Sequence, residues 1–255
     1  MKRIVLITAA AIGVGFAHTA FAADMGVRAA PAYVAPMVVA PTWTGLYIGF
    51  NGGWGWSNSN NSNLAFTGAF APFTVATSNN NANSPVFGGQ LGYNYQTGSW
   101  VWGIEGDIDG ANIEANQNVV LPIGGSAFLN EKQNWLASIR GRVGYTWGPG
   151  MIYVTGGGAW TGVQVTGGAT LLTGETGSFS TSSTQSGYVL GAGYEWMIAP
   201  SWSLRGEYLY YGFTNNLNTG ALAFPVSGTT VTGNVNKFNT SVVRIGLDYK
   251  FDWWR

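Results

Sequence analysis

The sequence predicts an all-β fold, an eight-stranded antiparallel transmembrane β-barrel with short periplasmic turns and long extracellular loops. Three observations predict it: an N-terminal export signal, eight segments in which apolar and polar residues alternate, and connections that are short and long in turn. Lipid-facing and lumen-facing residues alternate along each strand of such a barrel, so the segments average to near-neutral hydropathy. A mean hydropathy of +0.10 with only 9% charged residues agrees with this pattern.

The N-terminus has the pattern of a secretory signal peptide. Lys2 and Arg3 precede an apolar run from Ile4 to Ala17, and Ala20-Phe21-Ala22 forms the small-x-small pattern of a cleavage site. The apolar run has 14 residues, fewer than the ~20 that a transmembrane helix needs. We therefore expect residues 1–22 to be a signal peptide that is cleaved near Ala22/Ala23, and the mature protein to lie in the outer membrane of a Gram-negative bacterium.

Residues 23–42 are rich in proline and alanine, with Pro31, Pro36 and Pro41 at every fifth position. Because repeated proline prevents both helix formation and strand pairing, this segment is expected to be a periplasmic linker. A docking segment for a periplasmic partner is the alternative. Residues 43–255 are expected to form the barrel as one domain, since barrels often run to ~200–250 residues.

The composition excludes several functions. Cysteine is absent, and the only histidine is His18 in the signal peptide. The exported chain therefore lacks disulfides, thiolate and imidazole ligands, and the commonest general base. We expect no catalytic residues, no metal site and no cofactor. Without the two basic residues of the signal peptide, 9 basic and 11 acidic residues remain, with no basic cluster, so nucleic acid is not an expected partner.

Eight segments after Trp43 have a period of two, which is typical of half-buried strands. Most have the ~9 to 11 residues that a tilted membrane strand needs. They span Gly45 to Ser57, Pro85 to Gln96, Trp100 to Asp109, Glu131 to Trp147, Met151 to Val163, Thr184 to Met197, Ser201 to Phe213 and Lys237 to Phe251.

Short and long connections alternate between these segments. The short ones, with turn residues, are Gln96 to Ser99, Gly148 to Gly150 and Ile198 to Pro200. The long ones cover about Asn58 to Ser84, Ala111 to Asn130, Thr166 to Ser183 and Thr214 to Asn236. Outer-membrane barrels combine short periplasmic turns with long extracellular loops, so both termini are expected in the periplasm and four polar loops outside the cell.

The charged residues of the segments share one face. In the third segment, for example, Trp102 and Ile104 lie on one face, and Glu105 and Asp107 on the other. A charge facing lipid costs roughly 2–4 kcal/mol at the bilayer midplane, so a set of this size would outweigh the ~5–15 kcal/mol stability of a fold. We therefore place eleven charges inside the barrel: Glu105, Asp107, Asp109, Arg140, Arg142, Glu195, Arg205, Glu207, Arg244, Asp248 and Lys250.

Counting from the periplasmic turns predicts ion pairs across the lumen, subject to the stagger of the strands. The expected pairs are Glu105 with Arg142, Asp107 with Arg140, Glu207 with Arg244, and Arg205 with both Glu195 and Asp248. Two interpretations remain. The charges neutralise one another in an interior that side chains fill, or they form a catalytic or ion-conducting site for which the interior glycines leave room.

Tryptophans lie near both ends of the segments, as the two aromatic belts of a membrane barrel require. Those near the short turns are Trp100, Trp102, Trp147, Trp196 and Trp202, and those toward the long loops are Trp54, Trp56, Trp135 and Trp160.

Six short motifs in order resemble the porin-family, OmpA-like outer-membrane β-barrel proteins of small surface type. They are Trp43-Thr44-Gly45-Leu46-Tyr47-Ile48-Gly49, Gly89-Gln90-Leu91-Gly92-Tyr93-Asn94-Tyr95, Gly103-Ile104-Glu105-Gly106-Asp107, Gly141-Arg142-Val143-Gly144-Tyr145, Gly193-Tyr194-Glu195-Trp196 and Val243-Arg244-Ile245-Gly246-Leu247-Asp248-Tyr249-Lys250-Phe251. The resemblance implies an insertion signal at Tyr249 and Phe251 that the barrel-insertion machinery reads. Because residues 252–255 follow, either the signal tolerates an extension or Trp254 contributes to it.

The family resemblance implies structural, adhesive or porin-like roles at the cell surface. Haem binding through imidazole, which occurs in some members, is excluded by the missing histidine. We expect a filled barrel that contacts outer-membrane lipid and anchors four loops for an unknown extracellular ligand. A narrow passive porin for small hydrophilic solutes is the alternative. An enzyme is not expected, because no Gly-x-Ser-x-Gly motif occurs.

Overall fold

The computed structural model describes residues 42–59, 63–68, 73–76, 80–121, 124–214, 217–235 and 238–251. The predicted signal peptide, nearly all of the predicted linker and the last four residues lie outside this part of the chain. Within it, no helix is long and apolar enough to cross a membrane.

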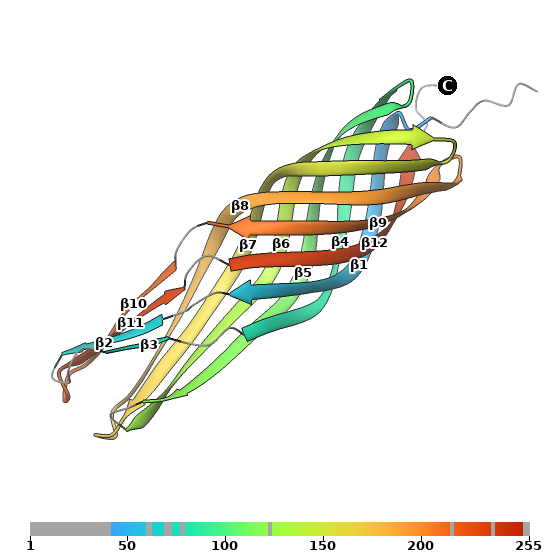
Figure 1. Cartoon of the computed structure of the whole chain (residues 1–255). Helices are drawn as coiled ribbons and strands as arrows, with labels where there is room; N and C mark the ends of the chain where they lie inside the picture. The colour runs from blue at the N-terminus through green and yellow to red at the C-terminus, as the bar shows by residue number, and fades with distance from the viewer. Residues whose placement is uncertain are drawn as a thin grey trace, which may run out of the picture. The chain divides into compact units, whose positions relative to one another are not determined.

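Eight antiparallel strands close into the predicted barrel (Figure 1). In ring order they are β1 (Gly45–Ser59), β12 (Phe238–Phe251), β9 (Trp202–Phe213), β8 (Thr176–Ala199), β7 (Gly150–Leu171), β6 (Gly125–Trp147), β5 (Trp100–Val120) and β4 (Asn80–Thr97). Each ring strand contains most of one segment that the sequence predicts.

Tight turns join the strands at the periplasmic end. Gly98 and Gly148 begin two-residue connections and have φ angles of 60° and 58°. Positive φ is favoured in two-residue hairpin turns, because such turns match the right-handed twist of the flanking strands. The third connection, Pro200 and Ser201, instead follows a register shift between Met197 and Ala199. The short connections that the sequence predicts are therefore confirmed.

The strands are staggered around the ring. A path from partner to partner that starts at Gly49 returns to β1 at Ser59, ten residues nearer the extracellular end. It passes through Gln90, Asp107, Ser138, Ala159, Gly187, Phe213 and Phe238. A stagger of ten residues over eight strands corresponds to a strand tilt of about 40°.

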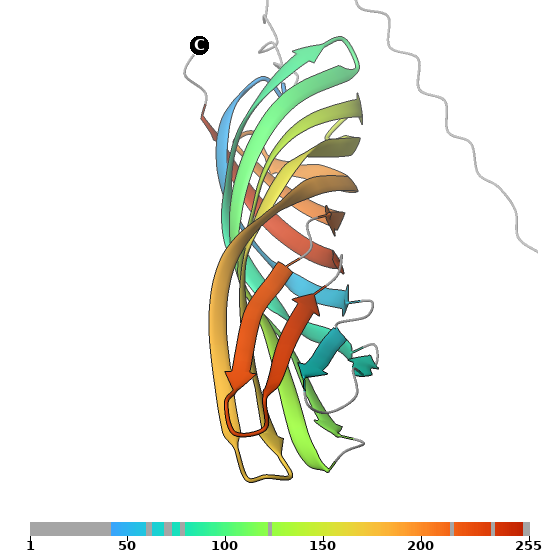
Figure 2. The same cartoon turned by 90° about the vertical axis from the view of Figure 1, so that its left-hand side faces the viewer.

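The long connections differ from the irregular loops that the sequence predicts. β5, β6, β7 and β8 have 21 to 24 residues each, about twice the length that a membrane strand needs, and continue as two long hairpins. The other two connections contain β2 (Asn63–Gly68), β3 (Phe73–Ala76), β10 (Leu217–Phe224) and β11 (Thr229–Val235). These four form a second sheet, in the order β10-β11-β2-β3 (Figures 1 and 2).

The reason for this difference is visible in the extended part of β7. Val163, Val165, Ala169 and Leu171 are buried on one face of the strand, whereas Gln164 and Thr170 between them are exposed. The segment is polar in composition because Thr, Gln and Gly fill most of the other positions. The alternation of buried and exposed residues nevertheless favours a strand, and it influences the fold more than the polar composition does.

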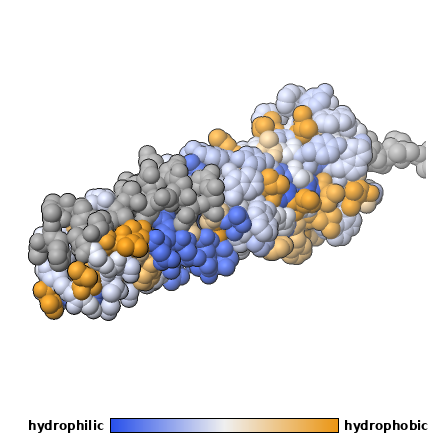
Figure 3. Space-filling model, turned by 60° about the horizontal axis from the view of Figure 1, so that its bottom comes forward, coloured by the Kyte–Doolittle hydropathy of each residue, from blue (hydrophilic) through white to orange (hydrophobic). Residues whose placement is uncertain are grey.

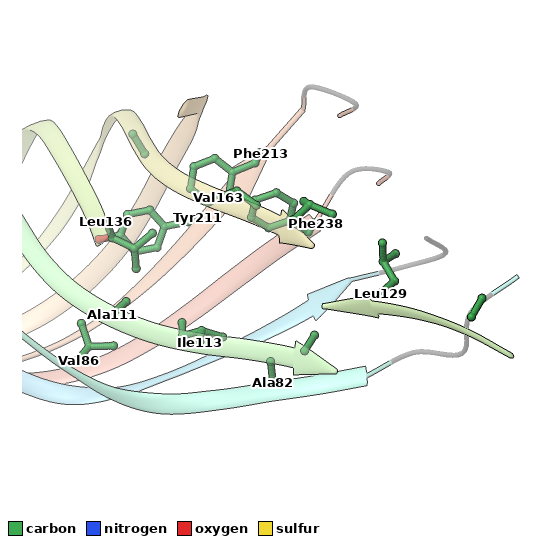
Figure 4. Packing of buried hydrophobic residues seen from close by; sticks show 14 of the residues in the cluster. Ala82, Val86, Ala111, Ile113, Leu129, Leu136, Val163, Tyr211, Phe213 and Phe238 are labelled. Atoms are coloured by element: carbon green, nitrogen blue, oxygen red, sulfur yellow. The ribbon is translucent and has the colours of Figure 1, made fainter. Parts of the chain in front are cut away.

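Toward the extracellular end, apolar side chains fill the space between the strands (Figure 4). Leu136, Val189, Leu209 and Val242 are completely buried there. Phe66 of β2 belongs to the same cluster, together with Phe224 and Val231 from the β10–β11 hairpin. One apolar core therefore joins the second sheet to the upper part of the barrel.

The outer surface changes character along the barrel. Apolar and weakly polar residues cover the end with the tight turns, at the right of Figure 3, and strongly hydrophilic residues gather nearer the opposite end. Large apolar side chains of the membrane part are more than half exposed, among them Phe50, Ile104, Ile108 and Ile139. This surface faces lipid, which supplies its apolar environment.

Candidate functional site

Ten of the eleven charges that the sequence places inside the barrel form one buried cluster, here named the charge network. Their side chains are at most 4% exposed. Five strands supply them: Glu105, Asp107 and Asp109 from β5, Arg140 and Arg142 from β6, Glu195 from β8, Arg205 and Glu207 from β9, and Arg244 and Asp248 from β12.

Lys250 lies apart from the charge network. It is the last inward-facing residue of β12, two positions beyond Asp248, and is only half-buried at the periplasmic mouth. Its ammonium group donates a hydrogen bond to the carbonyl oxygen of Thr42. The residue therefore ties the start of the described chain to the barrel end.

Arg140 joins two walls of the barrel. Its Nη2 contacts the carboxylates of Glu105 and Asp107, the latter at 2.9 Å, and its Nη1 lies 3.3 Å from Oε2 of Glu207. The two β5 carboxylates belong to the neighbouring strand, whereas Glu207 lies three positions away around the ring. A single guanidinium group thus holds three carboxylates together.

Arg205 reaches fully across the lumen. Its Nη1 lies 2.6 Å from Oε2 of Glu105, on the strand opposite in the ring, and its Nε lies 2.6 Å from Oδ2 of Asp248. Arg244 makes a similar crossing, with Nη1 2.5 Å from Asp109 and Nε 2.6 Å from Glu207. Both side chains lie in the path that a solute would take.

The predicted ion pairs are present with one exception. Arg142 lies 3.5 Å from Glu105, but its shorter contact is with Glu195, at 2.5 Å. Arg205 faces Glu195 across the strand pair, yet no ion pair joins these two, because Glu195 binds Arg142 instead.

The strand register also differs from the count made from the turns. Glu105 lies opposite Arg140, and Asp107 lies opposite Ser138, an offset of two residues. The count assumed level strands, whereas the stagger of the barrel displaces β5 along β6.

Neutral donors complete the charge network. The hydroxyl of Tyr47 donates to Glu105 at 2.5 Å, Ser138 to Asp107 at 2.6 Å, and Ser203 to Glu195 at 2.5 Å. Tyr153 and Gln90 donate in the same way to Glu207 and Asp248. Six carboxylates face four guanidinium groups, so these donors stabilise the excess negative charge. None of the five is predicted as a donor from the sequence, although the alternation places Ser138 and Ser203 on the face that carries the charges.

The interior glycine at position 49 leaves no open space beside it. A Cβ added to Gly49 would overlap Oδ1 of Asp248 and lie 2.6 Å from Nε2 of Gln90. The space that the absent side chain vacates is therefore occupied by the charge network. Close approach of charged groups to the backbone explains why glycine stands here.

The periplasmic side of the charge network is closed by apolar residues. Trp43 is 3% exposed, packs with Val101, Met151, Tyr153 and Met197, and donates its indole N–H to Thr146 at 3.0 Å. From the sequence, Trp43 is predicted only to be the first residue of the barrel. A cavity of about 20 Å³ next to it has room for about one water molecule.

The predicted aromatic belts lie on the outer wall. At the periplasmic end, Trp100, Tyr145, Trp147, Tyr194 and Trp196 form a row whose neighbouring ring centroids are 5.4 to 6.5 Å apart. The exposed Trp102 lies at the same end, in β5. The alternation of residues places Tyr145 and Tyr194 on the outward face as well, but the predicted belts comprise tryptophans alone.

Four tryptophans lie toward the extracellular end. Trp54 and Trp160 are 51% and 38% exposed, Trp56 contacts Tyr208, and Trp135 is half-buried beside a register shift in β6.

Tyr249 and Phe251, the expected insertion signal, contact each other edge to face. The centroid of Tyr249 lies 5.1 Å from Phe251 and 5.0 Å from Trp202. Both rings therefore belong to the aromatic surface at the periplasmic end. Trp254 lies outside the described residues.

Each carboxylate of the charge network lies within ion-pair distance of a guanidinium group. Among the residues that the structure describes, no group of His, Cys, Asp or Glu side chains is arranged to hold a metal ion.

Comparison with known proteins agrees with this architecture. A family model described as "outer membrane protein beta-barrel domain" matches residues 8–251. The chain is 31% identical over 253 residues to a 25 kDa outer-membrane immunogenic protein of Brucella canis, covering 98% of this chain and 99% of that protein. It is 33% identical over 258 residues to a 31 kDa outer-membrane immunogenic protein of Brucella melitensis, covering 98% and 100%.

Among solved structures, the outer membrane protein OprG from Pseudomonas aeruginosa is similar in fold, with a TM-score of 0.50 and 13% identity over 82% of this chain and 97% of that one. The barrel, the lipid-facing wall and these relatives agree on location as well as fold. The protein is an outer-membrane protein, and it belongs to the outer membrane protein β-barrel family.

Proposed function

We propose that this protein is a sealed barrel that anchors an extracellular β-structure at the cell surface. The observation that carries the proposal is the crossing of the lumen by Arg205 and Arg244, each of which binds carboxylates on other walls. A buried guanidinium with several partners is fixed in place, because separating it from them leaves unpaired charges. The interior then stabilises the barrel instead of conducting solutes.

The extracellular part supports a surface role. The long hairpins and the second sheet share an apolar core, so they form a folded structure that a partner can recognise. The Brucella relatives are named immunogenic, which fits parts that project from the cell. Beyond the membrane, β8 also presents a row of exposed hydroxyl side chains suited to an uncharged, hydrogen-bonding partner: Thr176, Ser178, Ser180, Ser182, Thr184 and Ser186.

A passive porin is less well supported. Above the charge network, the apolar cluster of the upper barrel leaves a cavity of about 20 Å³ beside Ile113 and Phe238. A hydrophilic solute would have to displace both this cluster and the ion pairs. An enzymatic role has no support from the residues, since the exported chain has no histidine to act as a general base.

Two measurements test the proposal. Proteoliposomes that contain the purified protein should swell in solutions of small sugars no faster than protein-free vesicles. Swelling that is fast in small sugars and slower in larger ones would support the porin. An epitope inserted after Thr173, in the turn between β7 and β8, should bind antibody on intact cells. Binding only after permeabilisation would refute surface display.

A further inference from the structure

The lipid-facing wall carries a groove of about 790 Å³ over β1, β4, β5 and β6, bordered by Trp160 of β7. Its volume is in the range of about 300–1,000 Å³ that small-molecule sites occupy. The walls are large apolar side chains, among them Phe50, Leu91, Ile108, Ile139 and Trp160. These residues are 38% to 77% exposed, so the groove is open to the surroundings of the barrel.

The depth of the groove comes from small residues between the large ones. Gly89 lies opposite Phe50 and Ile108, and Gly106 lies opposite Leu91 and Ile139. A Cβ at Gly89 would meet only the carbonyl oxygen of Gly49, at 3.5 Å, and a Cβ at Gly106 only that of Ser138, at 3.7 Å. Both positions therefore point into open space, and packing does not require glycine at either.

The stagger of the strands sets the direction of the groove. Gly106 pairs with Ile139, and Ala137 lies two residues further toward the extracellular end of β6. With strands about 4.8 Å apart, a rise of about 3.3 Å per residue and a tilt of about 40°, a step of one strand and two residues runs nearly parallel to the barrel axis. The line from Tyr93 through Gly106 to Ala137 is therefore nearly parallel to the membrane normal.

The position of the small residues selects one leaflet. Trp102 of the periplasmic belt precedes Gly106 by four residues, and Trp160 of the extracellular belt pairs with Ala137. Gly106 is therefore close to the membrane midplane. Above it the floor continues to Ala137, whereas below it the ring of Tyr93 occupies the same line. The deep part of the groove faces the outer leaflet.

We propose that this groove binds one saturated acyl chain of an outer-leaflet lipid, with the chain end near Gly106 and the headgroup end near Trp160. A straight, unbranched and apolar ligand aligned with the membrane normal fits the shape, and lipid is the surrounding medium. A second copy of the chain fits less well, since a two-fold interface would place the same ridges, such as Phe50 and Ile139, against each other.

A photoreactive lipid tests the proposal. The mature protein is reconstituted into dimyristoyl phosphatidylcholine vesicles that contain a small fraction of the same lipid with a diazirine in the middle of one chain. After illumination, labelled peptides are mapped by mass spectrometry. Labelling between Gly106 and Ala137 should exceed labelling around Gly206 by about threefold, the factor expected for a modest preference in a membrane.

Matched variants separate the groove from bulk lipid. Gly106→Leu fills the groove and should reduce labelling there to the level around Gly206. Gly206→Leu is the control, because Gly206 also faces outward on β9 and a Cβ there meets nothing within 4 Å. It should leave the groove labelling unchanged. Ala137→Leu fills the same groove from β6 and provides a second variant if Gly106→Leu folds poorly.

Four results would overturn the proposal. Equal labelling around the whole barrel would mean ordinary lipid contact, and groove labelling that both filling variants leave unchanged would exclude binding in the groove. Labelling concentrated below Gly106, near Leu46 and Tyr93, would contradict the assignment to the outer leaflet. Cross-links between two protein chains at this wall, lost in Gly106→Leu, would identify a second copy as the occupant.

Discussion

Single residues in the lumen act through several partners at once. Arg140 contacts Glu105, Asp107 and Glu207, all with buried side chains. Lys132, in the extended part of β6, has one partner, Glu114, at 2.7 Å, and both side chains are about 40% exposed. Water screens the ion pair of Lys132 with Glu114 but not the buried ion pairs of Arg140. The two positions therefore compare an exposed charge with a buried charge in the same strand.

Arg140→Met should reduce the free energy of unfolding by about 3–5 kcal/mol, because it leaves buried carboxylates without their cation. Lys132→Met, the control, should change it by less than about 1 kcal/mol. Urea unfolding in lipid vesicles, followed by tryptophan fluorescence, measures both. Similar losses in the two variants would mean that the charge network does not stabilise the barrel.

Tyr47 tests the neutral donors of the charge network. Tyr47→Phe removes the hydrogen bond to Glu105, as well as an acceptor that lies 3.1 Å from Nη1 of Arg142. The expected loss is about 1–3 kcal/mol of unfolding free energy, since buried polar groups lose a partner. Tyr93→Phe changes an outward-facing ring on β4 and should have almost no effect in the same measurement. A neutral result for Tyr47→Phe would contradict the role given to its hydroxyl.

Residue identity alone could predict much of this interior. The charges alternate with apolar residues along each strand. Because a charge facing lipid is so costly, the period of two is enough to place the charged face in the lumen and the apolar face toward lipid. The donors Tyr47 and Tyr153 could not be assigned from composition, because tyrosine is as common in the aromatic belts as in the lumen. Partners across the ring, such as Arg205 with Glu105, depend on the stagger, which no local pattern encodes.

Among the structural elements, the connection between β7 and β8 is attached to the one between β10 and β11. Glu175 accepts hydrogen bonds from the backbone N–H groups of Val226 at 2.8 Å and Ser227 at 2.9 Å. Desolvation opposes ionisation of Glu175, but the hydrogen bonds from Ser227 and Val226 outweigh it, so its pKa lies below the usual value. This carboxylate therefore connects two extracellular hairpins, and we call the contact of Glu175 with Val226 and Ser227 the latch.

The latch should weaken in acid. A carboxyl group with a lowered pKa contributes its full stabilisation above its unfolded pKa of about 4.3, and loses it as pH falls toward the folded value. Hydrogen exchange protection of the Val226 and Ser227 amides should therefore decrease below about pH 4. Glu175→Gln should lower this protection at neutral pH and remove its dependence on pH. Glu114→Gln is the control, and an unchanged pH dependence in Glu175→Gln would exclude the latch.

Neighbouring glycines on adjacent strands test how closely the ring is packed. Gly49→Ala places a methyl group against Asp248 and Gln90, whereas Gly89→Ala points toward lipid. We expect Gly49→Ala to cost about 1–3 kcal/mol through overpacking, and Gly89→Ala to have little effect. Equal unfolding midpoints in urea would contradict the closely filled lumen.

At this scale the sequence predicts the ring strands well, because each has alternating residues and six of the eight end at a periplasmic turn. β2, β3, β10 and β11 were not predicted, since they are short, rich in Asn and Thr, and lie within long connections. Their pairing joins β2 to β11, which are more than 160 residues apart in the chain. Such pairing depends on the apolar core that Phe66 and Phe224 share with the upper barrel, a tertiary effect.

For the whole molecule, two layers fill the barrel in different ways. Ion pairs cross the lumen in the membrane part, and the apolar cluster around Leu136 and Val242 closes the part above. The charged layer satisfies groups that could not face lipid, and the apolar layer continues into the extracellular sheet. In the function proposed above, both layers stabilise the membrane part, which carries the extracellular strands.

Single-channel recording in planar bilayers tests this sealed interior most directly. Purified mature protein, inserted at low density in a high-salt solution, should give no stepwise current, because the charge network and the apolar cluster block the lumen in series. Reproducible current steps from the folded, unmodified protein would contradict the account, since ions would then pass where Arg205 and Arg244 cross.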